Sequence, residues 1–179
     1  MNKDLTRGPI FKTLLLFSLP ILGSMIFQQA YTLADSVIAG KAIGEQALAA
    51  VNAYNEITSL YLAFAVGCNI GCSVVVSQLF GAGRTGELKT AVYTMFFSAC
   101  GLALLLTGGG LLLSPSLLRA IRTPDAFYTD AVRYLNIYLL GLLFLFLYNI
   151  STGIFTALGD SKTPLYFLIG STLLNIGLD

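Results

Sequence analysis

Five long apolar stretches, separated by short polar ones, run the length of the chain. A helix needs about 20 residues to cross a bilayer core, and no hydrophilic stretch between these segments is long enough to fold as a soluble domain. The pattern predicts transmembrane helices at about residues 10–39, 46–80, 90–113, 125–158 and 163–179. A short interfacial helix is expected at 116–123, within a single all-helical membrane domain over residues 1–179.

The composition supports a multi-pass membrane protein whose surroundings are the lipid bilayer. Hydrophobic residues make up 56% of the chain and charged residues 11%, whereas about 25% of the residues in soluble domains are charged. A net charge of +1 gives no electrostatic footprint for nucleic acid. The sequence has no histidine, and its cysteines, Cys68, Cys72 and Cys100, lie inside apolar segments, where packing is a better interpretation than a metal or disulfide site.

The first helix is predicted to be retained, with its amino terminus in the cytoplasm. Its apolar run continues through Gln28 and Asp35 without the small-residue cleavage site of a signal peptide. Lys and Arg number six on the amino-terminal side of the membrane and four on the other: Lys3, Arg7, Lys12, Arg84, Lys89 and Lys162, against Lys41, Arg119, Arg122 and Arg133. By the positive-inside rule this excess predicts a plasma-membrane protein, of the prokaryotic inner-membrane type, with a cytoplasmic amino terminus.

Polar residues form a stripe along the outer part of the first helix. Spacings of 0, 4, 7, 8 and 11 residues place them on one helix face: Ser24, Gln28, Tyr31, Thr32 and Asp35. Pro20 lies in the same helix and removes one helical hydrogen bond, so it is either a static kink or a hinge. A carboxylate at the end of such a stripe marks a candidate ion-binding position.

Further polar positions occur in the second and fourth helices. Asn52, Asn55, Glu56 and Ser59 share a face of the second helix, where Glu56 is either membrane-embedded or interfacial. Downstream, Gly67-x3-Gly71 is typical of a face that packs closely against another helix. In the fourth helix a second stripe consists of Asn149, Thr152 and Thr156. The turn 40–45 is expected to separate the first two helices.

Asn175 and Asp179 stand four residues apart on the fifth helix and share a face. Together with Asp35 they form a candidate cation site, because carboxylate and amide oxygens suit a proton, Na⁺ or another hard cation. In the alternative reading, Asp35 caps the first helix at the interface and Asp179 is an exposed tail.

Several motifs resemble one transporter family. They are SLPI at 18–21, QQAYTLADSVIAG at 28–40, GEQALAAV at 44–51, SQLFGAG at 77–83, YLLGLLFLFLYNISTGIFTALGDSKTP at 138–164 and LNIGLD at 174–179. Their combination is similar to the MATE family (multidrug and toxic compound extrusion), within the larger MOP flippase superfamily. The resemblance implies twelve helices in two six-helix lobes, of which this chain would be the amino-terminal lobe without the end of helix 5 and helix 6.

The resemblance also implies a secondary active transporter rather than an enzyme. Its family exports cationic or amphipathic drugs in exchange for H⁺ or Na⁺, by alternating access and without a further cofactor. Asp35, Asn175 and Asp179 match the family's cation site, which would hold any Na⁺, and Pro20 matches a helix 1 proline about which bending has been proposed. Gln28, Tyr31, Thr32, Glu56 and Asn149 are candidates for lining the cavity, although Glu56 departs from the family pattern.

Three other interpretations remain open. A lipid or polysaccharide precursor flippase of the same superfamily would need several basic residues in its cavity, and the embedded positions here are acidic or neutral. An intramembrane aspartyl enzyme would use Asp35 and Asp179 as a dyad. The third interpretation is an inactive fragment, because without the carboxy-terminal lobe the chain has only part of a cavity.

Overall fold

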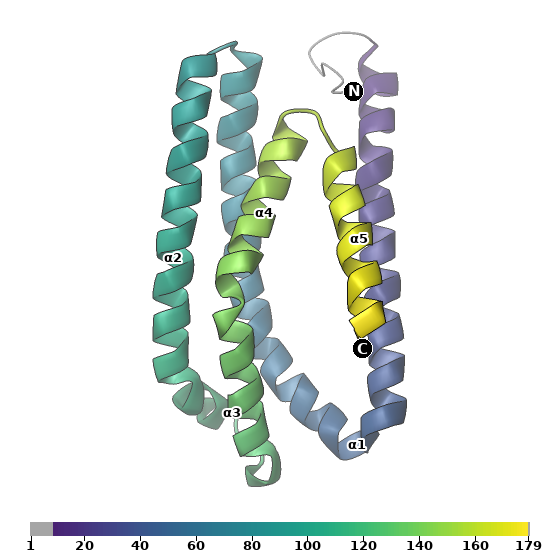
Figure 1. Cartoon of the computed structure of the whole chain (residues 1–179), viewed down its shortest axis with the longest axis vertical. Helices are drawn as coiled ribbons and strands as arrows, with labels where there is room; N and C mark the ends of the chain where they lie inside the picture. The colour runs from purple at the N-terminus through teal and green to yellow at the C-terminus, as the bar shows by residue number, and fades with distance from the viewer. Residues whose placement is uncertain (1–8, 179) are drawn as a thin grey trace.

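The computed structural model describes the backbone of residues 9–178, and their side chains except at 31–54, 126–127 and 176–178. The described chain is helical, with no strand, and this confirms the all-α prediction. The helices are α1 (Ile10–Gly81), α2 (Thr85–Ala120), α3 (Asp125–Leu140), α4 (Leu142–Ala157) and α5 (Lys162–Leu178). They pack as a bundle of long, roughly parallel rods (Figure 1).

α1 folds back on itself at the lower end of the molecule and forms two sides of the bundle (Figure 1). We call residues Ile10–Ala30 the first arm and residues Asn55–Gly81 the second arm. The predicted turn at 40–45 is wrong as a break, because this backbone stays helical throughout. The glycines at 40 and 44 tolerate helical geometry as well as turns, so the chain reverses by bending a helix rather than by interrupting it.

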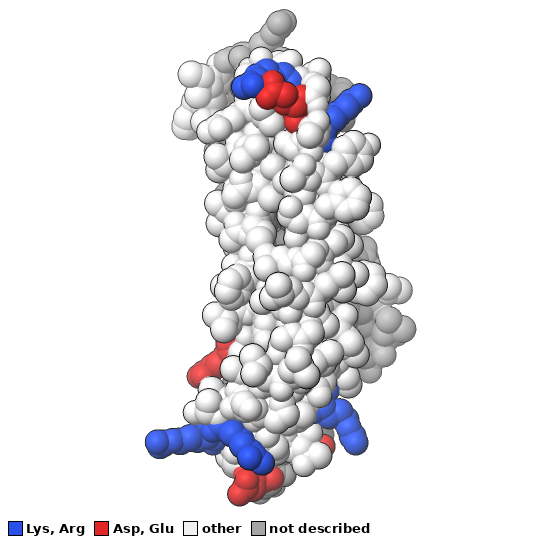
Figure 2. All heavy atoms as spheres, turned by 90° about the vertical axis from the view of Figure 1, so that its left-hand side faces the viewer, with Lys and Arg blue, Asp and Glu red and all other residues white. Residues whose placement is uncertain are grey.

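The bundle has the dimensions and charge distribution of a multi-pass membrane protein. Both arms of α1 and the whole of α2 are long and apolar enough to cross a membrane, and the pair α3 and α4 forms a further, bent span. Charged side chains gather at the two ends of the molecule, and a broad uncharged belt separates them on the face shown in Figure 2. The charged ends fit the two membrane surfaces and the belt fits the hydrocarbon core.

α2 continues through Ser114 and Pro115, so the predicted helix end at 113 and the predicted interfacial helix at 116–123 are wrong. Proline lacks an N–H, and this leaves the carbonyl of Leu111 without its usual helical donor. The Ser114 hydroxyl lies 3.3 Å from that carbonyl oxygen and 2.7 Å from Oδ1 of Asn136 on α3. A local side chain therefore compensates for the proline, and a contact with α3 holds the helix in place.

The predicted fourth helix, 125–158, is broken at Gly141, where α3 and α4 meet at 45°. The Gly141 N–H donates to the Tyr138 carbonyl at 2.9 Å, which tightens the last turn of α3. Thr107 of α2 donates its hydroxyl to the Leu139 carbonyl at 3.0 Å. Carbonyls at the end of a helix lack intrahelical donors, so this side chain stabilises the break from outside.

The buried core lies between the second arm, α2, α3 and α4. Its largest fully buried side chains include Phe146, Leu118, Leu135 and Leu139. Cys68 and Cys72 are free thiols packed against this core, which confirms their packing role. The first arm, in contrast, contributes no buried residue.

The predicted packing role of Gly67 and Gly71 is wrong within this chain. Both are exposed, and a Cβ at either position would meet nothing within 4 Å. The face of the second arm that packs inward is the neighbouring one, which carries Tyr61, Ala65 and Val76. The glycines that allow close helix contact are Gly110 on α2 and Gly153 on α4.

Candidate functional site: a polar cavity inside the bundle

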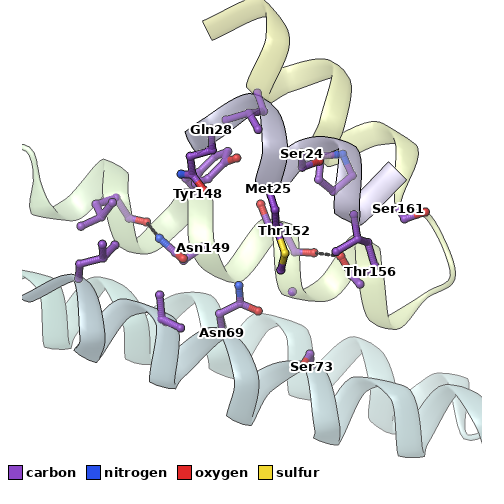
Figure 3. A pocket seen from close by; sticks show the side chains of 17 residues that line it. Ser24, Met25, Gln28, Asn69, Ser73, Tyr148, Asn149, Thr152, Thr156 and Ser161 are labelled. Atoms are coloured by element: carbon purple, nitrogen blue, oxygen red, sulfur yellow. Dashed lines mark hydrogen bonds between the residues drawn. The ribbon is translucent and has the colours of Figure 1, made fainter. Parts of the chain in front are cut away.

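A cavity of about 460 Å³ lies between the first arm, the second arm, α4 and the start of α5 (Figure 3). Its polar lining residues are Ser24, Gln28, Asn69, Ser73, Tyr148, Asn149, Thr152, Thr156 and Ser161. Apolar side chains such as Met25, Leu62 and Val66 complete the walls. No charged residue lines the described cavity, so it offers hydroxyl and amide dipoles on an apolar background.

The first wall carries the described part of the polar stripe on α1. Ser24 and Gln28, one helical turn apart, both line the cavity, with Met25 between them (Figure 3). The Ser24 hydroxyl donates to the Pro20 carbonyl at 2.9 Å, so its proton is used within the helix while oxygen lone pairs remain available as acceptors. The side chains of Tyr31 and Thr32 lie outside the described residues.

The opposite wall carries the second predicted stripe, on α4. Asn149 is only 9% exposed, and its Nδ2 donates to the Leu145 carbonyl at 2.9 Å. Thr156 donates its hydroxyl to the Thr152 carbonyl at 2.8 Å (Figure 3). Because both donors bond within α4, the side chains are held in fixed orientations along the cavity wall.

Asn69 and Ser73 on the second arm are lining residues that the sequence reasoning missed. With Leu62 and Val66 they recur at helical spacing, which was the available signal. Asn69 forms no hydrogen bond with another described residue. A Cβ added to Gly153 would overlap Asn69 Oδ1 and lie 3.0 Å from the Asn69 carbonyl oxygen, so the missing side chain at Gly153 makes room for Asn69.

α5 begins beside the cavity with a capped turn. Asp160 Oδ1 accepts hydrogen bonds from the N–H groups of Lys162 (3.2 Å) and Thr163 (3.1 Å). Its Oδ2 accepts one from the Thr163 hydroxyl at 2.7 Å. These bonds, that of the Thr163 hydroxyl foremost, lower the pKa of Asp160 below its ordinary value. The cap fixes the start of α5, where Ser161 and Pro164 line the cavity.

The residues of the predicted cation site are not brought together in the described structure. The Asp35 side chain and the whole of Asp179 lie outside the described residues, while Asn175 is exposed on α5 and is not a lining residue. Glu56 is exposed on the second arm and does not line the cavity. Among the described residues no group of three or more His, Cys, Asp or Glu could hold a metal. Convergence of Asp35, Asn175 and Asp179 stays a prediction.

The MatE family model matches residues 20–179 of this sequence. The chain belongs to the MatE family. Its MatE region is 34% identical, over 172 residues, to the probable multidrug resistance protein YpnP of Bacillus subtilis (strain 168), covering 96% of this chain and 39% of YpnP. It is also 26% identical over 178 residues to an FAD transporter of Shewanella oneidensis, covering 98% of this chain and 38% of that protein.

Solved MATE structures have the same fold as this MatE chain. A crystal structure of MATE in complex with MaD3S superposes with a TM-score of 0.90 at 24% identity, over 98% of this chain and 39% of that one. MATE in the bent conformation gives 0.88 at 25% identity. The chain thus spans about two fifths of the length of these relatives. Membership of MatE assigns it to a transporter family rather than to the aspartyl enzymes.

Proposed function

We propose that the complete protein exports cationic or amphipathic compounds in exchange for H⁺ or Na⁺, by alternating access, with no other cofactor. The observation that carries the proposal is a neutral polar cavity of about 460 Å³ in a chain of the MatE family. Ligand pockets have volumes of about 300–1,000 Å³, so a drug-sized molecule fits. The other lobe would supply the remaining surface of the transport pathway.

The lining chemistry supports a broad spectrum of weakly bound substrates. Serine, threonine and asparagine oxygens stabilise a cation by ion–dipole contacts, and a flexible side chain such as Met25 adapts to different apolar surfaces. A charged wall would bind one substrate tightly and release it slowly. In the proposal, the compensating negative charge comes from Asp35 and Asp179, with Asn175 as an added oxygen ligand.

Coupling follows if the ion and the substrate depend on the same carboxylates. Binding of H⁺ or Na⁺ at Asp35, Asn175 and Asp179 removes the negative charge that retains a cationic substrate, so the two ligands compete or favour different states. A ligand that bound both states equally would shift nothing. The proposal places the protein in the plasma membrane with its amino terminus in the cytoplasm, as the Lys and Arg distribution predicts.

The test compares two acid-to-amide substitutions in α1 of the full-length protein. Asp35→Asn removes the proposed coupling carboxylate, whereas Glu56→Gln removes an exposed carboxylate that does not line the cavity. We expect ion-driven dye efflux from everted vesicles to fall about ten-fold or more in Asp35→Asn and to stay within about two-fold in Glu56→Gln. Unaltered efflux in Asp35→Asn would remove Asp35 from the mechanism.

The named FAD transporter raises the alternative of an anionic, phosphate-bearing substrate. A phosphate-bearing substrate needs Arg or Lys in its site, as a lipid-precursor flippase would. The described lining has neither. Competition of FAD with the cationic dye in the same vesicles would distinguish the two substrate classes, and we expect none.

A further inference from the structure

A second hollow lies on the outer side of the contact between α4 and α5. It has a volume of about 340 Å³, and its outer lining is apolar, with Leu147, Phe155 and Phe167 among its residues. Phe167 is 69% exposed and Phe155 is 41% exposed, so this side of the groove is open to the surroundings. In a membrane protein those surroundings are lipid.

The groove and the polar cavity share one thin wall. Tyr148, Thr152 and Pro164 line both spaces. The wall is therefore a single layer of side chains, two from α4 and one from the first turn of α5. A rotation of the Tyr148 side chain would connect the two spaces without moving a helix.

Two hydroxyl groups at this wall are unusual for a membrane helix. Ser24, Ser73 and Thr156 use their hydroxyl protons on carbonyls of their own helices. The hydroxyls of Ser151, which lines the groove, and Thr152 have no partner among the described groups. An unpaired hydroxyl facing hydrocarbon is costly, so these two favour the passage of something polar.

The groove lies in one leaflet. Phe155 and Leu147 are five and thirteen residues from Asp160 in the turn, or roughly 7 and 20 Å along a helix axis. That turn and the start of α1 lie at the same end of the molecule (Figure 1). With the predicted cytoplasmic amino terminus, the groove faces the inner leaflet, from which an exporter must collect lipophilic compounds.

From these observations we infer that the α4–α5 seam is a lateral portal through which an amphipathic cation dissolved in the inner leaflet reaches the polar cavity. The apolar body of the molecule occupies the groove, the Ser151 and Thr152 hydroxyls receive its polar end, and the Tyr148 side chain gates the wall. The inference rests on the proposed export function and adds a route and a substrate class to it. A groove that only held a lipid chain would need no wall in common with the cavity.

The test fills the groove without touching the cavity. Ser151→Trp and Leu147→Trp each place an indole in the groove, and Phe144→Trp is the matched control because Phe144 is 72% exposed on α4 and lines neither space. In cells producing the full-length protein, we expect the initial rate of tetraphenylphosphonium efflux to fall about ten-fold in both groove variants and to remain within about two-fold in the control.

Binding separates the portal from the cavity. In detergent, tetraphenylphosphonium reaches the purified protein from water, so both groove variants should bind it within about two-fold of the unmodified affinity. Loss of efflux together with binding, or normal efflux in both groove variants, would overturn the portal. Normal efflux with loss of a co-purified phospholipid would instead identify a resident lipid and also overturn it. If the unmodified protein shows no efflux, the export function itself fails.

Discussion

Replacing Gly153 with alanine should force apart α4 and the second arm of α1 at the cavity wall. The new Cβ would overlap Asn69 Oδ1 and lie 3.0 Å from the Asn69 backbone oxygen, whereas ordinary contacts begin at 3.4 Å. The amide side chain can rotate away, but the backbone oxygen cannot. The helices must therefore separate by about 0.4 Å, the difference between these two distances.

The expected cost follows from three terms. Overpacking by one methyl group costs about 1–3 kcal/mol, and a strained Asn69 rotamer costs about 0.5–1.5 kcal/mol. Alanine recovers about 0.5–1 kcal/mol of helix propensity relative to glycine. The net destabilisation should be about 1–2 kcal/mol.

Equilibrium unfolding of the full-length protein in mixed detergent and SDS micelles measures this difference. Gly101→Ala on α2 is the control, because a Cβ there meets nothing within 4 Å and only the propensity gain remains. Combining Gly153→Ala with Asn69→Ala should recover the side-chain part of the cost and leave the backbone part. If Gly153→Ala were as stable as Gly101→Ala, or if the double variant showed no coupling, the close contact would be refuted.

Two further predictions concern polar contacts outside the cavity. Asp160→Ala should cost about 1 kcal/mol by removing the α5 cap, whereas Asp160→Asn should keep most of the cap. Because hydrogen bonds from Thr163 lower the folded-state pKa of Asp160, its stabilisation is complete above the unfolded pKa and is lost as pH falls through the folded pKa; unfolding measured against pH should show this acid-side loss in the wild type and not in Asp160→Asn. Ser114→Ala should cost about 1–2 kcal/mol, because it leaves the buried amide of Asn136 without its 2.7 Å partner, while Ser98→Ala on the exposed side of α2 should be neutral in the same unfolding assay.

The sequence predicted the helices and two walls of the cavity because both depend on periodicity. Ser24 with Gln28, and Asn149 with Thr152 and Thr156, recur at helical spacing in apolar surroundings, and the structure places all five on one cavity. Asn69 and Ser73 follow the same rule. They were missed because the small residues around them, Gly67 and Gly71 among these, gave a stronger but misleading packing signal.

The errors concern features that depend on distant residues. Pro115 reads as a helix end, yet Ser114 and Asn136, which is 22 residues away, hold α2 together around it. Gly141 lies in an unbroken apolar run, and the break there depends on Thr107 of another helix, 32 residues before the carbonyl it stabilises. The turn at 40–45 contains two glycines, whose permissiveness allows a bend as readily as a loop. No local pattern contains the information that decides these cases.

The lack of any buried residue in the first arm of α1 affects how the cavity opens. The second arm is anchored by Tyr61, Ala65 and Val76, but the first arm has no such anchor. Apolar side chains gain little by leaving lipid for a neighbouring helix, so this arm is held weakly from both sides. Stability is then uneven around the cavity: three walls are firm and the fourth has the lowest free energy of local opening. In native-state hydrogen exchange, amides of the first arm should exchange well before those of α4.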